Sequence, residues 1–155
     1  MLLPEDFKKT VLEIARKLSG HNYAIRGTAS LVLQDINMNA LDIDILTDKE
    51  TALICNEIFK EYLKKKIVYS ESPKFKSYFG SFELNNTLVE VMGEWEIKDA
   101  KGNWVKPKLI DKKEILIDGQ KVWVTTIESE LISFAAMGRW NAYWKIKKEA
   151  LRLKS

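Results

Sequence analysis

Apolar and polar positions follow two different periods along the chain, and these periods predict its secondary structure. Between residues 4 and 18 the apolar side chains recur at helical spacing, and Gly20 suits the turn that ends such a helix. Between residues 41 and 47 apolar and polar side chains alternate, as in a half-buried strand. The elements predicted for this part are a helix over 4–18, a strand over 22–26, a helix over 28–34, a strand over 41–47 and a helix over 48–66.

After residue 66 the pattern changes to strands. Asn85-Asn86 and Asp118-Gly119 each separate two runs with strand character, and both pairs of residues favour tight turns. The predicted strands cover 66–71, 74–84 and 87–97, and further short strands are expected between 104 and 126.

The last part of the chain returns to a helical pattern. Thr125 and Glu128 have the spacing of a capping box, so a helix is expected to follow and to reach about Met137. Gly138 interrupts the pattern, and a final helix is predicted over 139–154. The order of elements favours an α+β fold in which helices pack on a sheet.

Composition limits the class of protein. The length of 155 residues fits one domain, and 46% hydrophobic residues are enough for a packed core. A net charge of +3 permits nucleotide or nucleic-acid partners without requiring them. Cys55 is the single cysteine, so an intramolecular disulfide is excluded, and we expect a small core residue there. With no apolar run long enough for a membrane span, we expect a cytoplasmic protein that has no membrane partner.

Two aspartates interrupt the apolar strand over 41–47. Asp42 and Asp44 fall on one side of it, because side chains alternate, and two adjacent carboxylates repel each other. A divalent cation such as Mg²⁺ or Mn²⁺ would relieve that repulsion. Glu90 is the only charge in the run Leu88–Met92, whose strand could lie beside the first. Three acids from two strands could hold two metals about 4 Å apart, a geometry suited to phosphoryl transfer.

A candidate phosphate site precedes the acids. Gly27 allows close backbone approach at a strand-to-helix turn, and the helix opening at Thr28 would present free N–H groups to an anion. Thr28 and Ser30 add hydroxyl donors. Lys76 lies on a strand expected to neighbour the site and could neutralise a phosphate, although a solvated Lys is the alternative interpretation.

This order of motifs resembles the nucleotidyltransferase superfamily, which includes DNA polymerase β, the CCA-adding enzymes and small antibiotic nucleotidyltransferases. It looks most like the small single-domain prokaryotic members. The resemblance covers roughly residues 22–92 through "RGTASL", "DIDIL" and "LVEVMGE", and more weakly "IESELISFAAMGR". It implies a mixed, mostly antiparallel sheet flanked by helices, in one domain over 1–155 with its core at about 20–95 and further strands and helices at about 96–155.

The resemblance also implies an activity. A nucleoside monophosphate would pass from an NTP to an acceptor, with release of pyrophosphate and with dependence on Mg²⁺. Gly27 and Thr28 would hold the triphosphate, and Asp42 and Asp44 would bind both metals. Glu90 would bind the catalytic metal and activate the attacking hydroxyl. The acceptor stays open between tRNA, a protein hydroxyl and a small molecule, and a partner chain or homodimer is expected by analogy.

Two departures from the family pattern keep a second interpretation open. The third acid is usually Asp, and many relatives carry Arg and Ser or Thr where this chain has Met38 and Ala40. We hypothesise that Arg26 supplies some of the missing positive charge. The alternative is a catalytically inactive module of the same fold, acting as an antitoxin-like or regulatory partner of protein or RNA. A sugar transferase using the two aspartates ranks last, because such enzymes need a larger domain.

The final helix combines aromatic and basic residues. Trp140, Trp144 and Leu151 form a stripe that is predicted to pack on the core, with the basic residues in solvent. A nucleic-acid contact or a partner-protein face are the alternatives, and Arg139 could point at the nucleotide. His21, the single histidine, is expected in the loop between the first helix and the first strand.

Overall fold

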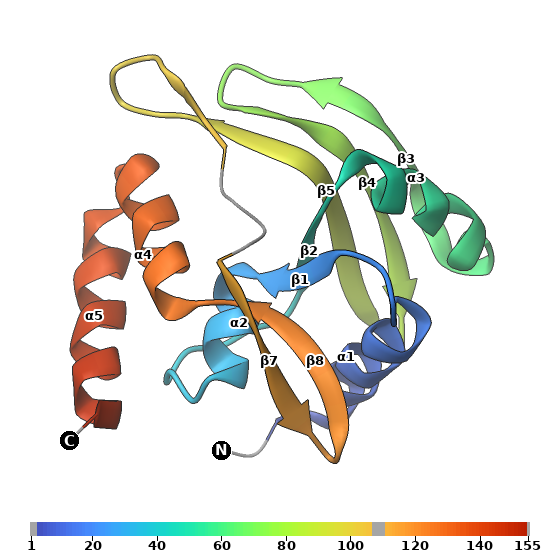
Figure 1. Cartoon of the computed structure of the whole chain (residues 1–155), viewed down its shortest axis with the longest axis horizontal. Helices are drawn as coiled ribbons and strands as arrows, with labels where there is room; N and C mark the ends of the chain where they lie inside the picture. The colour runs from blue at the N-terminus through green and yellow to red at the C-terminus, as the bar shows by residue number, and fades with distance from the viewer. Residues whose placement is uncertain (1–2, 107–110, 155) are drawn as a thin grey trace.

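The computed structural model describes residues 3–106 and 111–154 (Figure 1). The elements appear in the predicted order, and the α+β class is confirmed. The first part forms α1 (Glu5–Lys17), β1 (Tyr23–Arg26), α2 (Gly27–Leu33), β2 (Ile43–Thr47) and α3 (Lys49–Ile58). The second part forms η1 (Lys60–Tyr62), β3 (Leu63–Glu71), β4 (Phe75–Leu84), β5 (Thr87–Lys98), β6 (Trp104–Val105), β7 (Lys112–Ile117), β8 (Gln120–Thr125), α4 (Ile127–Ala136) and α5 (Trp140–Lys154).

One mixed sheet organises the described residues. Its strand order is β3-β4-β5-β2-β1-β8-β7, and β6 pairs with the far part of β5. β2 pairs with β5 and β1 pairs with β8 in parallel, whereas the other pairings are antiparallel. The predicted mixed, mostly antiparallel sheet is therefore confirmed. The parallel pairing of β2 with β5 joins strands that are more than forty positions apart in the sequence, and it brings Asp44 next to Glu90.

Helices α1 and α3 cover one face of the sheet, which we call the closed face. Ile43 and Ile45 of β2 and Val89 and Val91 of β5 point into this layer and are fully buried. Phe82 of β4 joins them. Burial of such side chains stabilises the fold by about 1.5–3 kcal/mol each. Cys55 of α3 lies in the same core as predicted, where burial raises the pKa of its thiol to about 12.

The opposite face, which we call the open face, is covered only in part. Helices α4 and α5 lie at one end of it (Figure 1). A small cluster of Leu46, Met92 and Trp95 packs there, with Met137 from the end of α4 against it. A second cluster of Leu31, Ile36, Phe134 and Ile146 joins α2 to the two C-terminal helices.

Several predicted boundaries were wrong. The helix predicted over 48–66 ends at Ile58, and Leu63 already belongs to β3. Lys and Glu favour a helix there, but pairing with β4 and the stacking of Phe59 on Phe82, with ring centroids 4.0 Å apart, outweigh that preference. β2 begins at Ile43, so Asp42 precedes it.

The helix near residue 126 begins one position later than predicted. Its N-cap is Thr126, whose hydroxyl accepts a hydrogen bond from the Ser129 N–H, rather than Thr125. Thr125 is instead the last residue of β8. The part of the predicted short strands that falls on 107–110 lies outside the described residues.

The aromatic stripe of the last helix does not pack on the core, contrary to the prediction. Trp140, Trp144 and Leu151 are 51%, 60% and 62% exposed, whereas Ile146 is fully buried and anchors α5. Residues at helical spacing lie on one face of a helix, but the spacing alone does not show whether that face packs against the rest of the protein. Among the described helices, none is long and apolar enough to cross a membrane.

Candidate active site

A row of polar side chains crosses the open face at one level of the sheet. Arg26 of β1 is the register partner of Asp44 of β2, and Asp44 is the partner of Glu90 of β5. Glu90 pairs with Ser81 of β4, and Ser81 pairs with Lys65 of β3. Directly opposed residues project from the same face of a sheet. The predicted neighbourhood of Asp44 and Glu90 is therefore present, flanked by a cation at each end.

Arg26 contacts Asp44 directly. Its Nη1 lies 3.3 Å from Asp44 Oδ2, and the side chains are 8% and 29% exposed. The guanidinium also lies over the Trp95 ring, 4.0 Å from its centroid, and donates weakly to Met92 Sδ at 3.8 Å. A partly buried ion pair of this kind fixes the orientation of both partners. The positive charge of Arg26 is thus directed at the first acid of the row.

The two acids of the row are held in an environment that disfavours their charge. Burial raises the pKa of Asp44, Arg26 opposes that rise, and Asp42 and Glu130 add to it. Burial also raises the pKa of Glu90, and the charges of Asp44 and Asp42 raise it further. Such groups are candidates for binding a cation or for accepting a proton.

Asp42 lies next to the row rather than in it. It precedes β2 and is exposed, yet its charge raises the pKa of both Asp44 and Glu90, so it belongs to the same electrostatic cluster. In residues 3–106 and 111–154, no group of three or more His, Cys, Asp and Glu side chains is arranged to hold a metal ion. In this arrangement Asp44 is paired with Arg26 instead. The carboxylate oxygens are nevertheless the donors that Mg²⁺ and Mn²⁺ prefer.

The turn at Gly27 lies against the acids. Gly27 has a φ of +70°, and a Cβ at this position would lie 3.5 Å from Asp44 Oδ2. The left-handed φ explains why glycine suits the position. Thr28 follows at the start of α2 and is half-buried. The strand-to-helix turn predicted from the sequence therefore directly adjoins Asp44.

Two predicted nucleotide contacts are not brought to the acids. Ser30 is fully buried, and its hydroxyl donates to the Thr125 carbonyl at 2.7 Å, which ties α2 to β8. Lys76 pairs with Glu96 near the far end of β4, and its Nζ lies over the Trp104 ring at 4.2 Å. Lys76 and Ser81 are five positions apart, which corresponds to about 16 Å along a strand.

Lys65 occupies the place that was expected for Lys76. It lies two strands from Glu90 in the row, and its charge opposes the rise in the pKa of Glu90. Its Nζ lies 5.2 Å from the centroid of the Phe79 ring. Lys65 was not among the predicted site residues, because the helix predicted over 48–66 included it, whereas it lies on β3.

A further carboxylate lies behind the row. Glu130 of α4 is only 2% exposed and accepts a hydrogen bond from the Thr125 hydroxyl at 2.6 Å. Its Oε1 is buried and has no hydrogen-bond partner among the described residues. Glu130 is close enough to raise the pKa of Asp44. The sequence could have indicated that Glu130 is buried, because Glu130 and Phe134 lie about one helical turn apart on the same side of α4.

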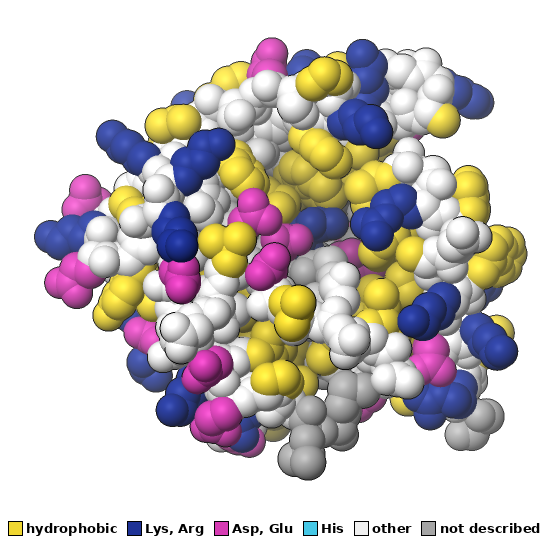
Figure 2. All heavy atoms as spheres, turned by 180° about the vertical axis from the view of Figure 1, so that it is seen from behind, with side chains coloured by type: hydrophobic (Ala, Val, Ile, Leu, Met, Phe, Trp, Pro, Cys, Tyr) yellow, Lys and Arg dark blue, Asp and Glu magenta, His cyan; other side chains and the backbone are white. Residues whose placement is uncertain are grey.

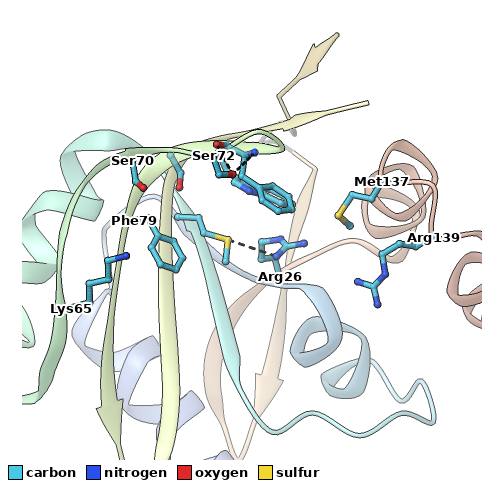
Figure 3. Close-up of a pocket in the computed structure, with 11 residues that line it drawn as sticks. Arg26, Lys65, Ser70, Ser72, Phe79, Met137 and Arg139 are labelled. Carbon is cyan, nitrogen blue, oxygen red and sulfur yellow. Dashed lines mark hydrogen bonds between the residues drawn. The ribbon is translucent and has the colours of Figure 1, made fainter. Parts of the chain in front are cut away.

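A pocket of about 450 Å³ adjoins the row on the open face. Figure 2 shows this side of the molecule hollowed, with hydrophobic and basic side chains around the hollow and acidic ones along one border. In Figure 3, Met137 and Arg139 from the α4–α5 connection face Arg26, and Lys65 and Phe79 lie on the other side. The lining residues are Arg26, Lys65, Ser70, Ser72, Phe75, Ser77, Phe79, Met92, Trp95, Met137 and Arg139.

Comparison with solved structures relates this architecture to known proteins. TM1012 from Thermotoga maritima, a protein assigned as a nucleotidyltransferase, superposes with a TM-score of 0.82 at 26% identity, covering 97% of this chain and 96% of that one. Its fold is that of the nucleotidyltransferase superfamily. The resemblance inferred from the sequence motifs is thereby confirmed, and the relatives support a transferase enzyme.

Two antibiotic-modifying enzymes share the fold at lower identity. The lincosamide antibiotic adenylyltransferase LnuA, solved with lincomycin, has a TM-score of 0.58 at 12% identity, covering 94% of this chain and 97% of that one. ANT(2")-Ia, solved with adenylyl-2"-tobramycin, has the same TM-score and identity and covers 94% and 89%. No protein-family model matches the sequence of this chain, and no curated protein matches it.

Proposed function

We propose that this chain is a divalent-metal-dependent nucleotidyltransferase that moves a nucleoside monophosphate from an NTP to an acceptor hydroxyl. One observation carries the proposal: Asp44 and Glu90 are register neighbours on parallel strands, directly beside the Gly27 turn. Carboxylates that repel each other next to a turn suited to phosphate are what a metal-bound triphosphate needs. We further propose that residues 1–155 act as one catalytic domain.

The donor would be held at the turn. Gly27 permits a phosphate to approach the backbone, and Thr28 adds a hydroxyl donor at the start of α2. Asp42, Asp44 and Glu90 would hold Mg²⁺ or Mn²⁺, since their oxygens are the donors that such ions prefer. When bound, the metal would supply Lewis acidity at the phosphate oxygens. For Asp44 to serve as a ligand, its present ion pair with Arg26 has to open or be shared.

The reaction would be an in-line displacement. The acceptor hydroxyl oxygen attacks the α-phosphorus, and a new oxygen–phosphorus bond forms. The bond from that phosphorus to the oxygen bridging to the β-phosphate breaks, and pyrophosphate leaves with the electron pair. The hydroxyl proton would pass to Glu90, the acid to which the family resemblance assigns activation of the attacking hydroxyl. Arg26 would orient Asp44 and compensate part of the charge that accumulates.

A transfer assay tests the proposal. The protein is incubated with each NTP, radiolabelled at its α-phosphate, with Mg²⁺ or Mn²⁺ and with pools of tRNA, proteins or small metabolites. Label that appears on one pool and disappears with Asp42→Asn/Asp44→Asn would support the activity and identify the acceptor class. Absence of transfer together with absence of NTP and Mn²⁺ binding would reject it.

A second candidate is a catalytically inactive module that binds protein or RNA as an antitoxin-like or regulatory partner. The loop before β2 favours it: Met38 packs against the cluster that joins α2 to α4 and α5, and Ala40 packs against the closed-face core. Both positions serve packing where many relatives carry polar residues. Mn²⁺ binding separates the two candidates, because an inactive module has no need of the ion and Asp44 is already paired with Arg26.

A further inference from the structure

We propose that the pocket between Lys65 and Arg139 is the acceptor site, and that it takes a small molecule with an apolar or aromatic body and an anionic group. This inference rests on the proposed nucleotidyl transfer and specifies its second substrate. It selects one of the three acceptor classes that the sequence left open and adds the chemistry of the molecule.

The pocket and the Gly27 turn lie on opposite sides of the acids. β1 runs antiparallel to β2, so the chain that continues past Arg26 to Gly27 moves away from the level of Leu46 and Met92. Phe79 and Met92, which line the pocket, are register partners. They lie about 7 Å along the strands from Glu90, on the side away from Gly27. In an in-line displacement the attacking oxygen and the leaving oxygen lie on opposite sides of the phosphorus. If the NTP is bound at the Gly27 turn, the pocket on the other side of the acids is free to bind the acceptor.

Much of the wall of the pocket is apolar. Trp95 is 5% exposed and is held between Arg26, 4.0 Å from its ring centroid, and Phe75, whose ring centroid is 6.1 Å away. Phe79 and Met92 form the side next to the acids, and Met137 closes the side towards α4. These side chains would contact a flat, apolar body.

The charge of the pocket selects for an anion. None of the described residues that line it is Asp or Glu, and three are cationic. Arg26 is engaged with Asp44, but no carboxylate of the described residues lies within ion-pair distance of Lys65 or Arg139. Lys65 lies over the ring of Phe79, and Arg139 lies over the ring of Phe134. Both charges are available to an anionic group.

Hydroxyl groups complete the set of polar contacts. Ser70 and Ser77 are register partners on β3 and β4, and Ser72 lies in the turn between these strands. The volume of about 450 Å³ falls in the range of small-molecule sites, roughly 300–1,000 Å³. A hollow of this size, with an apolar lining and a few polar groups, favours a small metabolite as the acceptor.

Three probes that share one naphthalene body and differ in charge test the pocket directly. 2-Naphthoate, 2-naphthol and 2-naphthylmethylammonium are titrated against the full-length protein, and their dissociation constants are measured by calorimetry. We expect 2-naphthoate to bind at least about tenfold more tightly than the cation, since one charge-assisted contact contributes about that factor. Equal affinities, tighter binding of the cation or no binding of any probe would overturn the proposal.

Variants locate the binding. Because Lys65 and Arg139 lie on opposite sides of the pocket, one carboxylate contacts only one of them, so at least one of Lys65→Gln and Arg139→Gln is expected to weaken 2-naphthoate about tenfold, and both should leave 2-naphthol unchanged. Lys64→Gln is the matched control, because Lys64 is the adjacent residue, is bound to Glu83 at 2.6 Å and does not line the pocket. No loss of affinity in either pocket variant, or a loss in the control that equals the larger loss of the two, would place the anion elsewhere and would refute the assignment.

A competition experiment with ATP distinguishes failure of the acceptor site from failure of the proposed nucleotidyl transfer. With Mg²⁺ present, ATP and 2-naphthoate should bind together, because donor and acceptor occupy opposite sides of the acids. Displacement of 2-naphthoate by ATP would show that the pocket takes the nucleotide, and this would overturn the acceptor role. If Asp44→Asn leaves ATP binding unchanged and no transfer is seen, the proposed function fails, and the naphthoate preference still reports whether the pocket selects anions.

Discussion

The two faces of the sheet are made from the same strands, yet they serve different purposes. On the closed face, Ile45 and Val91 are fully buried among α1 and α3. One position earlier on each strand, Asp44 and Glu90 emerge on the open face among other charges. Side chains that alternate along a strand allow one segment to stabilise the core and to present chemistry. Stability is therefore expected to depend mainly on the closed face, and activity mainly on the open face.

The closed face should show the largest effect on stability. Phe82→Ala removes the ring that stacks on Phe59 and leaves a cavity in the core, so we expect a loss of about 3–5 kcal/mol in the free energy of unfolding. Urea denaturation followed by fluorescence measures it. Phe75→Ala is the matched change on the open face, where the ring is 38% exposed, and should cost less than half as much. Similar losses for both variants would contradict the division between the faces.

The open face should show the largest effect on activity. Asp44→Asn keeps the size of the side chain but removes the charge, and we expect transfer to fall at least about 100-fold. The free energy of unfolding should not fall, because the change also relieves repulsion from Asp42 and Glu90. Asp118→Asn, on the distant β7–β8 turn, is the control and should leave transfer unchanged. Activity that survives in Asp44→Asn would reject the catalytic role of the row.

The turn at Gly27 offers a smaller test with a close control. Gly27→Ala forces an L-residue to a φ of +70° and should cost about 1–2 kcal/mol of stability, although its Cβ would have ordinary contact with Asp44. Gly119→Ala has the same backbone penalty at a φ of +80° and meets nothing within 4 Å. We expect only Gly27→Ala to weaken NTP binding as well, measured by calorimetry. Equal NTP affinities in the two variants would exclude the turn from the phosphate site.

The smallest predicted effect concerns pH. Asp44 and Glu90 have pKa values raised above those of the unfolded chain, so the folded state binds more protons in the range just above their ordinary values. The metal-free protein should therefore lose stability as the pH rises through that range. Thermal unfolding in chelator at several pH values measures it. Asp44→Asn/Glu90→Gln should flatten the profile, and an unchanged slope in this double variant would show that other groups are responsible.

Much of this architecture followed from local pattern. Alternation placed Ile43 and Ile45 on one face and Asp44 on the other, because a strand has a fixed period of two. Gly27 could be identified as a turn because few other residues adopt its backbone conformation. Glu90 stood out as a single charge in an apolar run. These inferences needed only neighbours along the chain, and the family resemblance rested on the same residues.

Only the tertiary structure decided which residues from distant parts of the sequence lie near Gly27, Asp44 and Glu90. Register between strands placed Lys65 in the same row as Glu90, two strands away, and placed Lys76 near the far end of β4. Packing buried Ser30 and left Trp144 in solvent, although both lie in helices that were predicted. The apolar pocket likewise collects residues from β1, β3, β4, β5 and the α4–α5 connection. Periodicity is a local property of the chain, whereas pairing and packing depend on which surfaces meet, and that choice is made by the fold as a whole.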